Sequence, residues 1–220
     1  MEHASVRIPM DALFLDADLS IPPGSQGIVV FAHGSGSGRH SPRNRNVAEV
    51  LSQAGLSTLL LDLLTPKEEV VDAQTRHLRF DIDLLARRLI GAMDWLSHNP
   101  STDSLHVGLF GASTGAAAAL VAAAERPNRV SAVVSRGGRP DLAHQALVKV
   151  RAPTLLIVGG RDEAVIRLNR QALSALRTVK ALEIVPGATH LFEEPGTLEQ
   201  VARLARVWFV RYLTTTQRRV

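Results

Sequence analysis

The chain has 220 residues, 45% of them hydrophobic and 21% charged, which is the size and composition of one globular domain. These values exclude a disordered, fibrous or disulfide-rich protein. The net charge is +4 and the sequence pI is about 10.3. A basic excess can attract nucleic acid, but the arginines are scattered or in short pairs with few aromatic residues between them. We therefore expect no nucleic-acid partner.

The chain contains no cysteine, which excludes disulfides, thiolate metal sites and a cysteine nucleophile. Its first residues lack the basic start and apolar core of a signal peptide. No apolar run approaches the roughly 20 residues that span a bilayer. These features predict a cytoplasmic protein that has no membrane partner.

Two short strands are expected between residues 6 and 21, and they end at Pro22-Pro23-Gly24. They predict an antiparallel hairpin within residues 1–26. Short, continuous apolar runs follow, of the kind found in strands that are covered on both faces. These runs are residues 27–33, 57–63, 105–110, 130–135, 154–158 and 182–185.

The segments between these runs have helical periodicity. Residues 77–98 carry an apolar stripe at helical spacing, and a last helix opens at Thr197 with a capping-box pattern. A polar tail, residues 214–220, follows it. The alternation predicts an α/β protein with a mostly parallel, doubly wound sheet and helices on both faces, all within one domain, residues 1–220. Ligands bind such sheets beyond the carboxyl ends of the strands.

A G-x-S-x-G motif occupies residues 111–115, between the predicted strand 105–110 and an alanine-rich helix. In this context the serine stands on a sharp turn that exposes its hydroxyl, and the next helix directs backbone N–H groups at the reacting oxygen. The alternative is a glycine-rich turn whose serine only caps a helix. Ser113 is the candidate nucleophile.

A serine hydroxyl is a weak nucleophile and needs a neighbouring base. His190 lies in the loop after the last predicted strand, from which it can reach back over the sheet toward Ser113. The alternative is a loop histidine with a structural hydrogen bond. Apart from His33, the other histidines lie in polar segments, at helix ends or at the start of a strand. His190 is therefore the candidate base.

The third member of such a site accepts a hydrogen bond from the imidazole. Among the acidic residues between Ser113 and His190, Asp162 is favoured because it follows the predicted strand 154–158 at its carboxyl end. Glu163 is the runner-up. A helix cap is the alternative role for Asp162.

A glycine-rich loop, residues 33–38, follows the first predicted parallel strand. It lacks the Lys-Ser/Thr pair of a phosphate-binding loop, and the dinucleotide-binding pattern is absent. We expect an oxyanion hole instead, with one backbone N–H from Ser35 and the other from Thr114. His33 would then be structural. The alternative is a loop that is only flexible.

These motifs together resemble α/β hydrolases, and more narrowly the small, dienelactone-hydrolase-like members that lack a large cap. The resemblance spans residues 27–213 and rests on His33-Gly34-Ser35, the turn at Ser113, and the segments Gly160-Arg161-Asp162 and Gly187-Ala188-Thr189-His190. It implies a Ser113–His190–Asp162 triad in an open site that needs neither cofactor nor metal. Dienelactone hydrolases proper carry a cysteine at the position of Ser113, so a serine esterase is the expected activity.

Residues 39–44 and 135–140 also resemble a subgroup in which some members are fused to phosphoribosyltransferase domains, and no such domain is expected within these 220 residues. The expected reaction is hydrolysis of an ester, lactone or thioester of a small molecule through an acyl-enzyme. Amide hydrolysis and cofactor-free perhydrolysis would use the same residues. The alternative function is a non-catalytic protein of this fold that binds a ligand.

Three arginines, Arg39, Arg136 and Arg139, are candidate contacts for an acidic substrate, and a role as ordinary surface arginines is equally compatible with the sequence. A homo-oligomer is also compatible with it.

Overall fold

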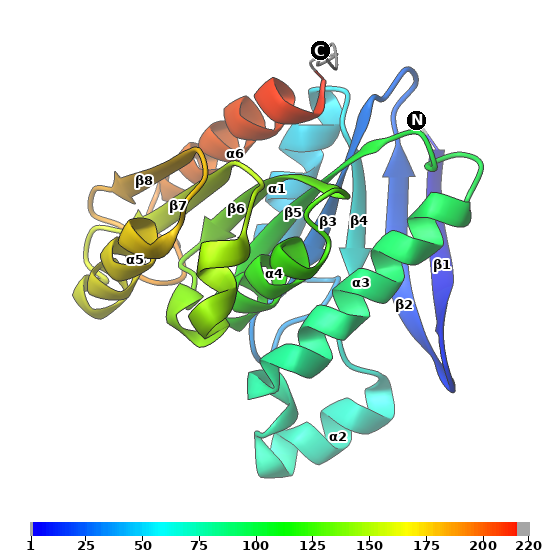
Figure 1. The fold of residues 1–220 in the computed structure, drawn as a ribbon, viewed down its shortest axis with the longest axis horizontal. Coiled ribbons are helices and arrows are strands. Elements are labelled where there is room, and N and C mark those ends of the chain that lie inside the picture. Colours follow the sequence, from blue (N-terminus) through cyan, green and yellow to red (C-terminus); the bar gives the residue numbers. More distant parts are fainter. Residues whose placement is uncertain (1, 215–220) are drawn as a thin grey trace.

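The computed structural model describes residues 2–214. One eight-stranded sheet in the order β1-β2-β4-β3-β5-β6-β7-β8 forms its centre (Figure 1). The strands are β1 (Glu2–Met10), β2 (Leu13–Ile21), β3 (Gly27–Ala32), β4 (Ser57–Leu61), β5 (His106–Ala112), β6 (Val130–Arg136), β7 (Thr154–Gly159) and β8 (Lys180–Val185). Neighbours from β4 to β8 are all parallel, and β2 runs antiparallel to both of its neighbours. The predicted mostly parallel α/β sheet is confirmed.

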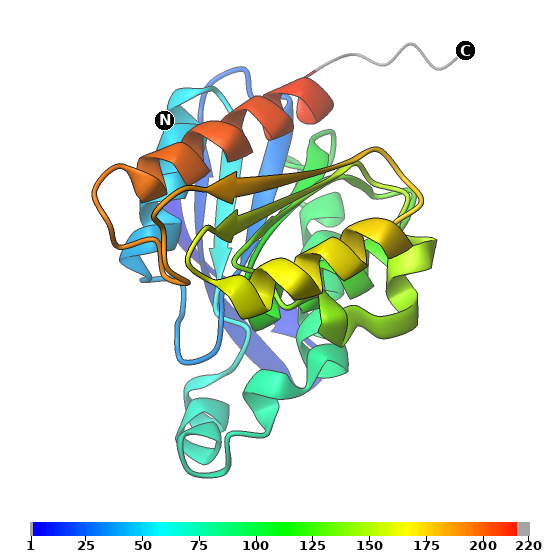
Figure 2. The same cartoon turned by 90° about the vertical axis from the view of Figure 1, so that its left-hand side faces the viewer.

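Helices cover both faces of this sheet, as predicted (Figure 2). One face carries α3 (Ile82–His98), α4 (Thr114–Glu125), α5 (Glu163–Ala175) and the 3-10 segment Pro140–Lys149. The other face carries α1 (Pro42–Gln53) and α6 (Thr197–Leu213). Between β4 and α3, the helix α2 (Pro66–Thr75) and the turn Leu78–Phe80 project beyond the sheet (Figure 1). No larger cap is present in residues 2–214.

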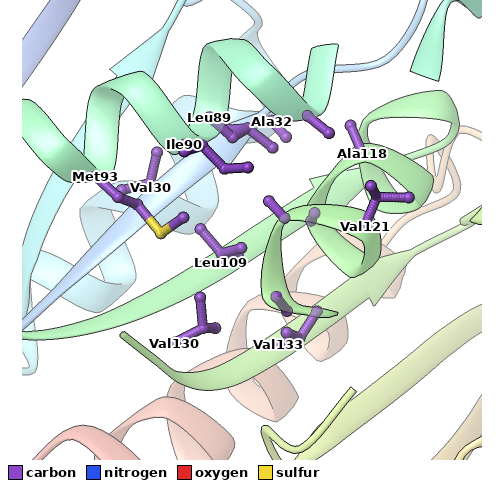
Figure 3. Close-up of a cluster of buried hydrophobic side chains, with 14 of the residues drawn as sticks. Val30, Ala32, Leu89, Ile90, Met93, Leu109, Ala118, Val121, Val130 and Val133 are labelled. Carbon is purple, nitrogen blue, oxygen red and sulfur yellow. The ribbon is translucent and has the colours of Figure 1, made fainter. Parts of the chain in front are cut away.

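The core on the α3 and α4 side is built from branched strand residues and from small helix residues. Figure 3 shows Val30, Leu109 and Val133 of the sheet facing the side chains of α3 and α4. Ala118 is fully buried, like most residues of α4. Because alanine projects so little from the helix, α4 packs close to the strands and holds its first turn against the carboxyl ends of β3 and β5.

One helix start and one helix cap differ from the sequence expectation. The stripe at residues 77–98 predicts one helix, but α3 begins only at Ile82, because the Asp81 carboxylate accepts the Leu84 N–H at 2.9 Å and caps the helix there. The last helix, α6, begins at Thr197 as expected, but the capping box predicted there is not formed. Gly196, with φ of 80°, precedes α6, and the Thr197 hydroxyl donates to the Glu194 carbonyl at 2.7 Å instead.

The last strand is also more exposed than the sequence predicts. The apolar run 182–185 predicts a strand that is covered on both faces, but Glu183 and Ile184 of β8 are exposed. Within residues 2–214, β8 is an edge strand that pairs only with β7, so helices shield it less completely than the central strands. The predicted polar tail, residues 214–220, lies outside the described residues except for Thr214. In residues 2–214, no helix combines the length and apolar content needed to cross a membrane.

Candidate active site

Ser113 lies on the turn between β5 and α4, where the carboxyl end of a central strand meets a helix N-terminus. Its backbone has φ of 51° and ψ of −119°, a conformation that costs a residue other than glycine about 1–3 kcal/mol. The flanking glycines permit this turn. A Cβ on Gly111 would lie 2.3 Å from the Ala116 Cα, and one on Gly115 would lie 2.3 Å from the Ala32 carbonyl oxygen. No side chain fits at either position.

Backbone hydrogen bonds hold the strained serine in place. Its N–H donates to the Arg136 carbonyl at 3.2 Å, and its carbonyl accepts from the Ala116 and Arg139 N–H groups at 3.1 Å each. The Ser113 hydroxyl caps no backbone group of α4. It also has no hydrogen-bond partner among residues 2–214. The half-buried hydroxyl is therefore available for chemistry, and the helix-capping alternative is not realised.

The structure brings Asp162 and His190 together. Asp162 follows β7 and precedes α5, and its Oδ2 lies 2.6 Å from the His190 Nδ1. A carboxylate only accepts hydrogen bonds, so Nδ1 carries the proton and Nε2 is left as the basic nitrogen. The Asp162 side chain caps no N–H of α5, and the histidine is paired with Asp162 rather than with Glu163, the runner-up.

The loop that carries His190 is fixed on both sides of the histidine. The Glu194 carboxylate accepts the Thr189 N–H at 3.0 Å, and hydrogen bonds from Thr189 lower the pKa of Glu194. Phe192 is almost fully buried and holds a φ of 55°. These contacts anchor the loop against the core and leave the His190 side chain at the surface of the sheet edge.

The segment 136–139 lies against both Ser113 and His190. The Arg136 carbonyl and the Arg139 N–H bond to the backbone of Ser113. A Cβ on Gly137 would lie 3.5 Å from Nδ1 and Cε1 of the His190 ring. The candidate nucleophile and base therefore both lie beside one short, glycine-containing segment at the end of β6.

Ser35 and Thr114 are also brought together. Their hydroxyl oxygens are 3.1 Å apart, which joins the glycine-rich loop to the first turn of α4. Among the described residues, neither backbone N–H donates to a backbone acceptor. Two unpaired N–H donors beside a strained serine are the groups that an oxyanion hole needs.

His33 connects the start of the same loop to the end of β4. Its Nε2 accepts the Leu63 N–H at 2.9 Å, and its Nδ1 donates to the Gly34 carbonyl at 3.0 Å. Burial lowers the pKa of His33, and this outweighs the opposite effects of the Gly34 carbonyl and of Asp62. A neutral ring is also the form that makes both hydrogen bonds.

The three candidate arginines differ in what they contact. Arg39 pairs with Asp62, and Arg139 forms a two-point ion pair with Asp141 at 2.9 and 2.8 Å. Arg136 is buried, and its Nη1 has no hydrogen-bond partner among residues 2–214. Burial, together with the nearby Arg43 charge, lowers the pKa of Arg136 to about 10. Two of the three charges are thus already neutralised within the protein.

A cleft of about 620 Å³ opens beside the glycine-rich loop, residues 33–38. Ser35 and Thr114 line it, and its far wall is formed by residues of α2 and of the turn before α3, including Asp72 and Arg79. Arg79 binds Asp72 at 2.5 Å, and its hydrogen bonds outweigh the opposing effect of burial, so the pKa of Asp72 is lowered. The cleft offers space for a small molecule next to the two N–H donors.

Two residues that support this site, Asp62 and Glu194, are not predicted from the sequence. Asp62 holds Arg39, but it falls inside the run 57–63, which was expected to be all strand. The signal that could have identified Asp62 is a carboxylate near the end of an apolar run, since ligands gather at the carboxyl ends of strands. Glu194, which holds the His190 loop, has no local signal because its partner Thr189 is a backbone donor.

In residues 2–214, no cluster of three or more His, Asp or Glu side chains is arranged to hold a metal ion.

Comparison with known proteins gives the chain its family. The model of the dienelactone hydrolase family matches residues 15–213. A Mycobacterium tuberculosis protein named as a phosphoribosyl transferase is 63% identical over 195 residues, which are 89% of this chain and 43% of that protein. The chain therefore spans less than half the length of this relative.

Solved structures agree with the family match. A dienelactone hydrolase from Anabaena variabilis is 64% identical, with a TM-score of 0.95 over 96% of this chain and 98% of that one. Est1E from Butyrivibrio proteoclasticus is 16% identical, with a TM-score of 0.79 over 96% of this chain and 99% of its own. At that identity, the second likeness concerns the fold alone.

Proposed function

The chain belongs to the dienelactone hydrolase family, and we propose that it is a serine hydrolase that cleaves an ester, lactone or thioester bond of a small molecule. The observation that carries this proposal is the 2.6 Å pairing of Asp162 with His190 on the sheet edge that also presents the strained Ser113. Triad chemistry requires a base that a carboxylate orients and a nucleophile on a sharp turn.

In the proposed first half-reaction, His190 Nε2 removes the hydroxyl proton of Ser113 while the Oγ attacks the carbonyl carbon. The backbone N–H groups of Ser35 and Thr114 stabilise the oxyanion that forms. Asp162 stabilises the charged imidazole and keeps its own charge. His190 then gives its proton to the leaving alcohol or thiol, which departs and leaves an acyl-enzyme on Ser113.

The second half-reaction repeats these steps with water. His190 takes a proton from the water, whose oxygen attacks the acyl carbon, and it returns that proton to the Ser113 Oγ as the acid leaves. No step in this sequence requires a metal or a cofactor. The cleft beside Ser35 and Thr114 is the proposed place for the part of the substrate that flanks the carbonyl.

The name of the longer mycobacterial relative does not transfer to this chain. The matched 195 residues are only 43% of that protein, whereas the family model covers residues 15–213 here. The part shared with the longer protein is therefore the hydrolase-family part. Because Ser113 replaces the thiol of a cysteine enzyme, we favour esters and thioesters generally over dienelactones as substrates.

Hydrolysis of a panel of p-nitrophenyl esters and acyl thioesters tests this proposal. We expect turnover by the wild type, and loss of roughly 10⁴-fold or more in kcat for Ser113→Ala and His190→Ala and of about 10²- to 10⁴-fold for Asp162→Asn. Ser174→Ala and His98→Ala change exposed residues at the ends of α5 and α3 and serve as matched controls that keep full activity. Turnover that survives Ser113→Ala would contradict the proposal.

A further inference from the structure

The loop of residues 34–40, here called the oxyanion loop, has little internal support. Three of its seven residues are glycines, and its internal hydrogen bonds include the turn from the Ser37 N–H to the Gly34 carbonyl at 3.2 Å. Gly36 adopts a φ of 69°. Glycine-rich chain samples many conformations, so anchors outside the loop must hold the Ser35 N–H in one position.

Both ends of the oxyanion loop are anchored to the residues that directly follow β4. At the near end, the Leu63 N–H donates to His33 at 2.9 Å. At the far end, the Asp62 carboxylate accepts the backbone N–H of Arg39 at 2.6 Å, and its second oxygen binds the Arg39 guanidinium. A Cβ on Gly38 would lie 2.8 Å from the Asp62 Oδ1, so the carboxylate sits tightly against the loop.

The N-terminal hairpin fixes the orientation of this anchor. The Asp62 N–H donates to the Asp16 carbonyl at 3.0 Å. The Arg39 side chain is 22% exposed, and its guanidinium lies 3.9 Å from the Asp16 carboxylate and 3.7 Å from that of Asp18. Three carboxylates therefore surround Arg39. Its charge is neutralised within the protein, so Arg39 holds the loop and does not bind an acidic substrate.

We propose that Asp62 is a positioning residue of the oxyanion hole: by clamping Arg39 it holds the oxyanion loop so that the Ser35 N–H points at the developing oxyanion. This inference rests on the proposed function. Asp62 does not touch the reacting atoms and acts through Arg39 and the loop. Its contribution is therefore made in the transition state, where the oxyanion exists, and not in the binding of the neutral substrate.

The test is the kinetic behaviour of Asp62→Asn. The amide keeps an acceptor for the Arg39 N–H, but it loses the charge and places N–H donors against the guanidinium. We expect kcat for p-nitrophenyl ester hydrolysis to fall by about 10- to 100-fold, less than for the complete loss of an oxyanion donor, while KM stays within about threefold. The inhibition constant of a trifluoromethyl ketone, whose adduct places an oxyanion in the hole, should rise by the factor by which kcat/KM falls.

Asp81→Asn is the matched control, because the Asp81 carboxylate also accepts a backbone N–H, at the start of α3. It should leave kcat and the inhibition constant unchanged and the fold little affected, because asparagine caps helices about as well as aspartate. If Asp62→Asn does not fold, Gly38→Ala, whose methyl group displaces the same carboxylate, is judged by the same criteria. An unchanged kcat, or a loss confined to KM, would overturn the inference. A wild type that hydrolyses no ester would overturn the proposed function instead.

Discussion

Ser113 has a strained backbone conformation that few residues other than glycine adopt. Its φ of 51° is held by three backbone hydrogen bonds and by two glycines that admit no side chain. Strain of about 1–3 kcal/mol persists only where the surroundings impose it, and it is concentrated at functional sites. Here the strain places a half-buried hydroxyl, free of capping bonds, at the carboxyl end of a central strand.

Gly137 lies against the candidate base in the segment that is bonded to the backbone of the candidate nucleophile, so a single methyl group tests their arrangement. Gly137 has φ of 50°, and a Cβ there would lie 3.2 Å from the His190 carbonyl oxygen and 3.5 Å from its ring. We expect Gly137→Ala to destabilise the fold by about 1–2 kcal/mol and to lower kcat by about tenfold or more, through displacement of His190. Urea unfolding and ester kinetics on the same preparation measure both.

Gly24→Ala is the control for that substitution. Gly24 has φ of 73°, which imposes similar backbone strain, but nothing lies within 4 Å of a Cβ at this position. It should therefore lose stability and keep its kcat. If Gly137→Ala also kept the wild-type kcat, the proposed contact between this segment and the reacting histidine would be wrong.

His33 makes the stability of the protein depend on pH. Its pKa in the folded state is lowered from the usual 6.5, chiefly by burial, so the unfolded chain binds a proton at a pH where the folded chain does not. Stability is therefore lost as the pH falls below about 6.5, until the folded ring itself is protonated. The slope contributed by this residue is at most about 1.4 kcal/mol per pH unit.

Urea unfolding at about pH 7.5 and pH 5.5 isolates this contribution. His33→Asn should be less stable than the wild type at both values, yet it should lose less of its stability on acidification. His98→Asn, which changes an exposed histidine at the end of α3, should show the wild-type dependence. Equal losses for His33→Asn and the wild type would show that the buried ring is not the titrating group.

At the scale of elements, the carboxyl ends of the parallel strands bring the site together. The loops after β3, β4, β5, β6, β7 and β8 all open on the same edge of the sheet, and they carry Ser35, Asp62, Ser113, Gly137, Asp162 and His190 in that order. The helices hold these strands in position from both faces. Anything that shifts one strand end along the sheet therefore shifts one group of the site.

The packing of α6 on the sheet gives a stability test at this scale. Phe209 is fully buried, and a Cβ on Gly108 of β5 would lie 2.7 Å from its ring. Phe209→Ala removes this contact and leaves a cavity, so we expect a loss of about 3–5 kcal/mol in the free energy of unfolding. Phe80→Ala, at a ring that is 54% exposed, should cost less than about 1 kcal/mol. Similar losses for the two variants would contradict this packing.

Local sequence signals predict most of the elements and fewer of the contacts between them. The apolar runs locate the strands to within a few residues, and the G-x-S-x-G turn places Ser113 where the structure has it. The start of α3 and the cap of α6 are missed because a single side chain, at Asp81 or Thr197, decides between a helix cap and another partner. A pattern of hydrophobic residues carries no information on that choice.

Contacts between segments that are distant in the sequence are the part that local patterns do not predict. Asp162 and Asp62 follow strands in the same way, but Asp162 is found because triad chemistry demands an acid between the serine and the histidine. Asp62 binds Arg39, 23 residues away, and no motif links the two. Such a pairing depends on β3 lying beside β4, which is a property of the folded sheet.

For the whole molecule, one sheet carries two layers of helices and one edge of the sheet carries the candidate active site. Arg39 and Arg79 beside the cleft are each paired with a carboxylate, whereas the Nη1 of the buried Arg136 has no hydrogen-bond partner among residues 2–214. The cleft near the proposed oxyanion hole is bounded by α2 and by the turn before α3, the part of the chain that projects beyond the sheet (Figure 1). Substrate selection is expected to depend on this projecting part.

The central claim, that Ser113 is an activated nucleophile, is tested most directly by labelling with a fluorophosphonate. The probe needs an activated serine and no knowledge of the substrate. Intact mass and peptide mapping of the wild type, Ser113→Ala and His190→Ala should show one adduct, on Ser113. The adduct should be absent from Ser113→Ala and slowed by about 100-fold or more in His190→Ala. A folded wild type that forms no adduct, or forms it at another residue, would contradict the account.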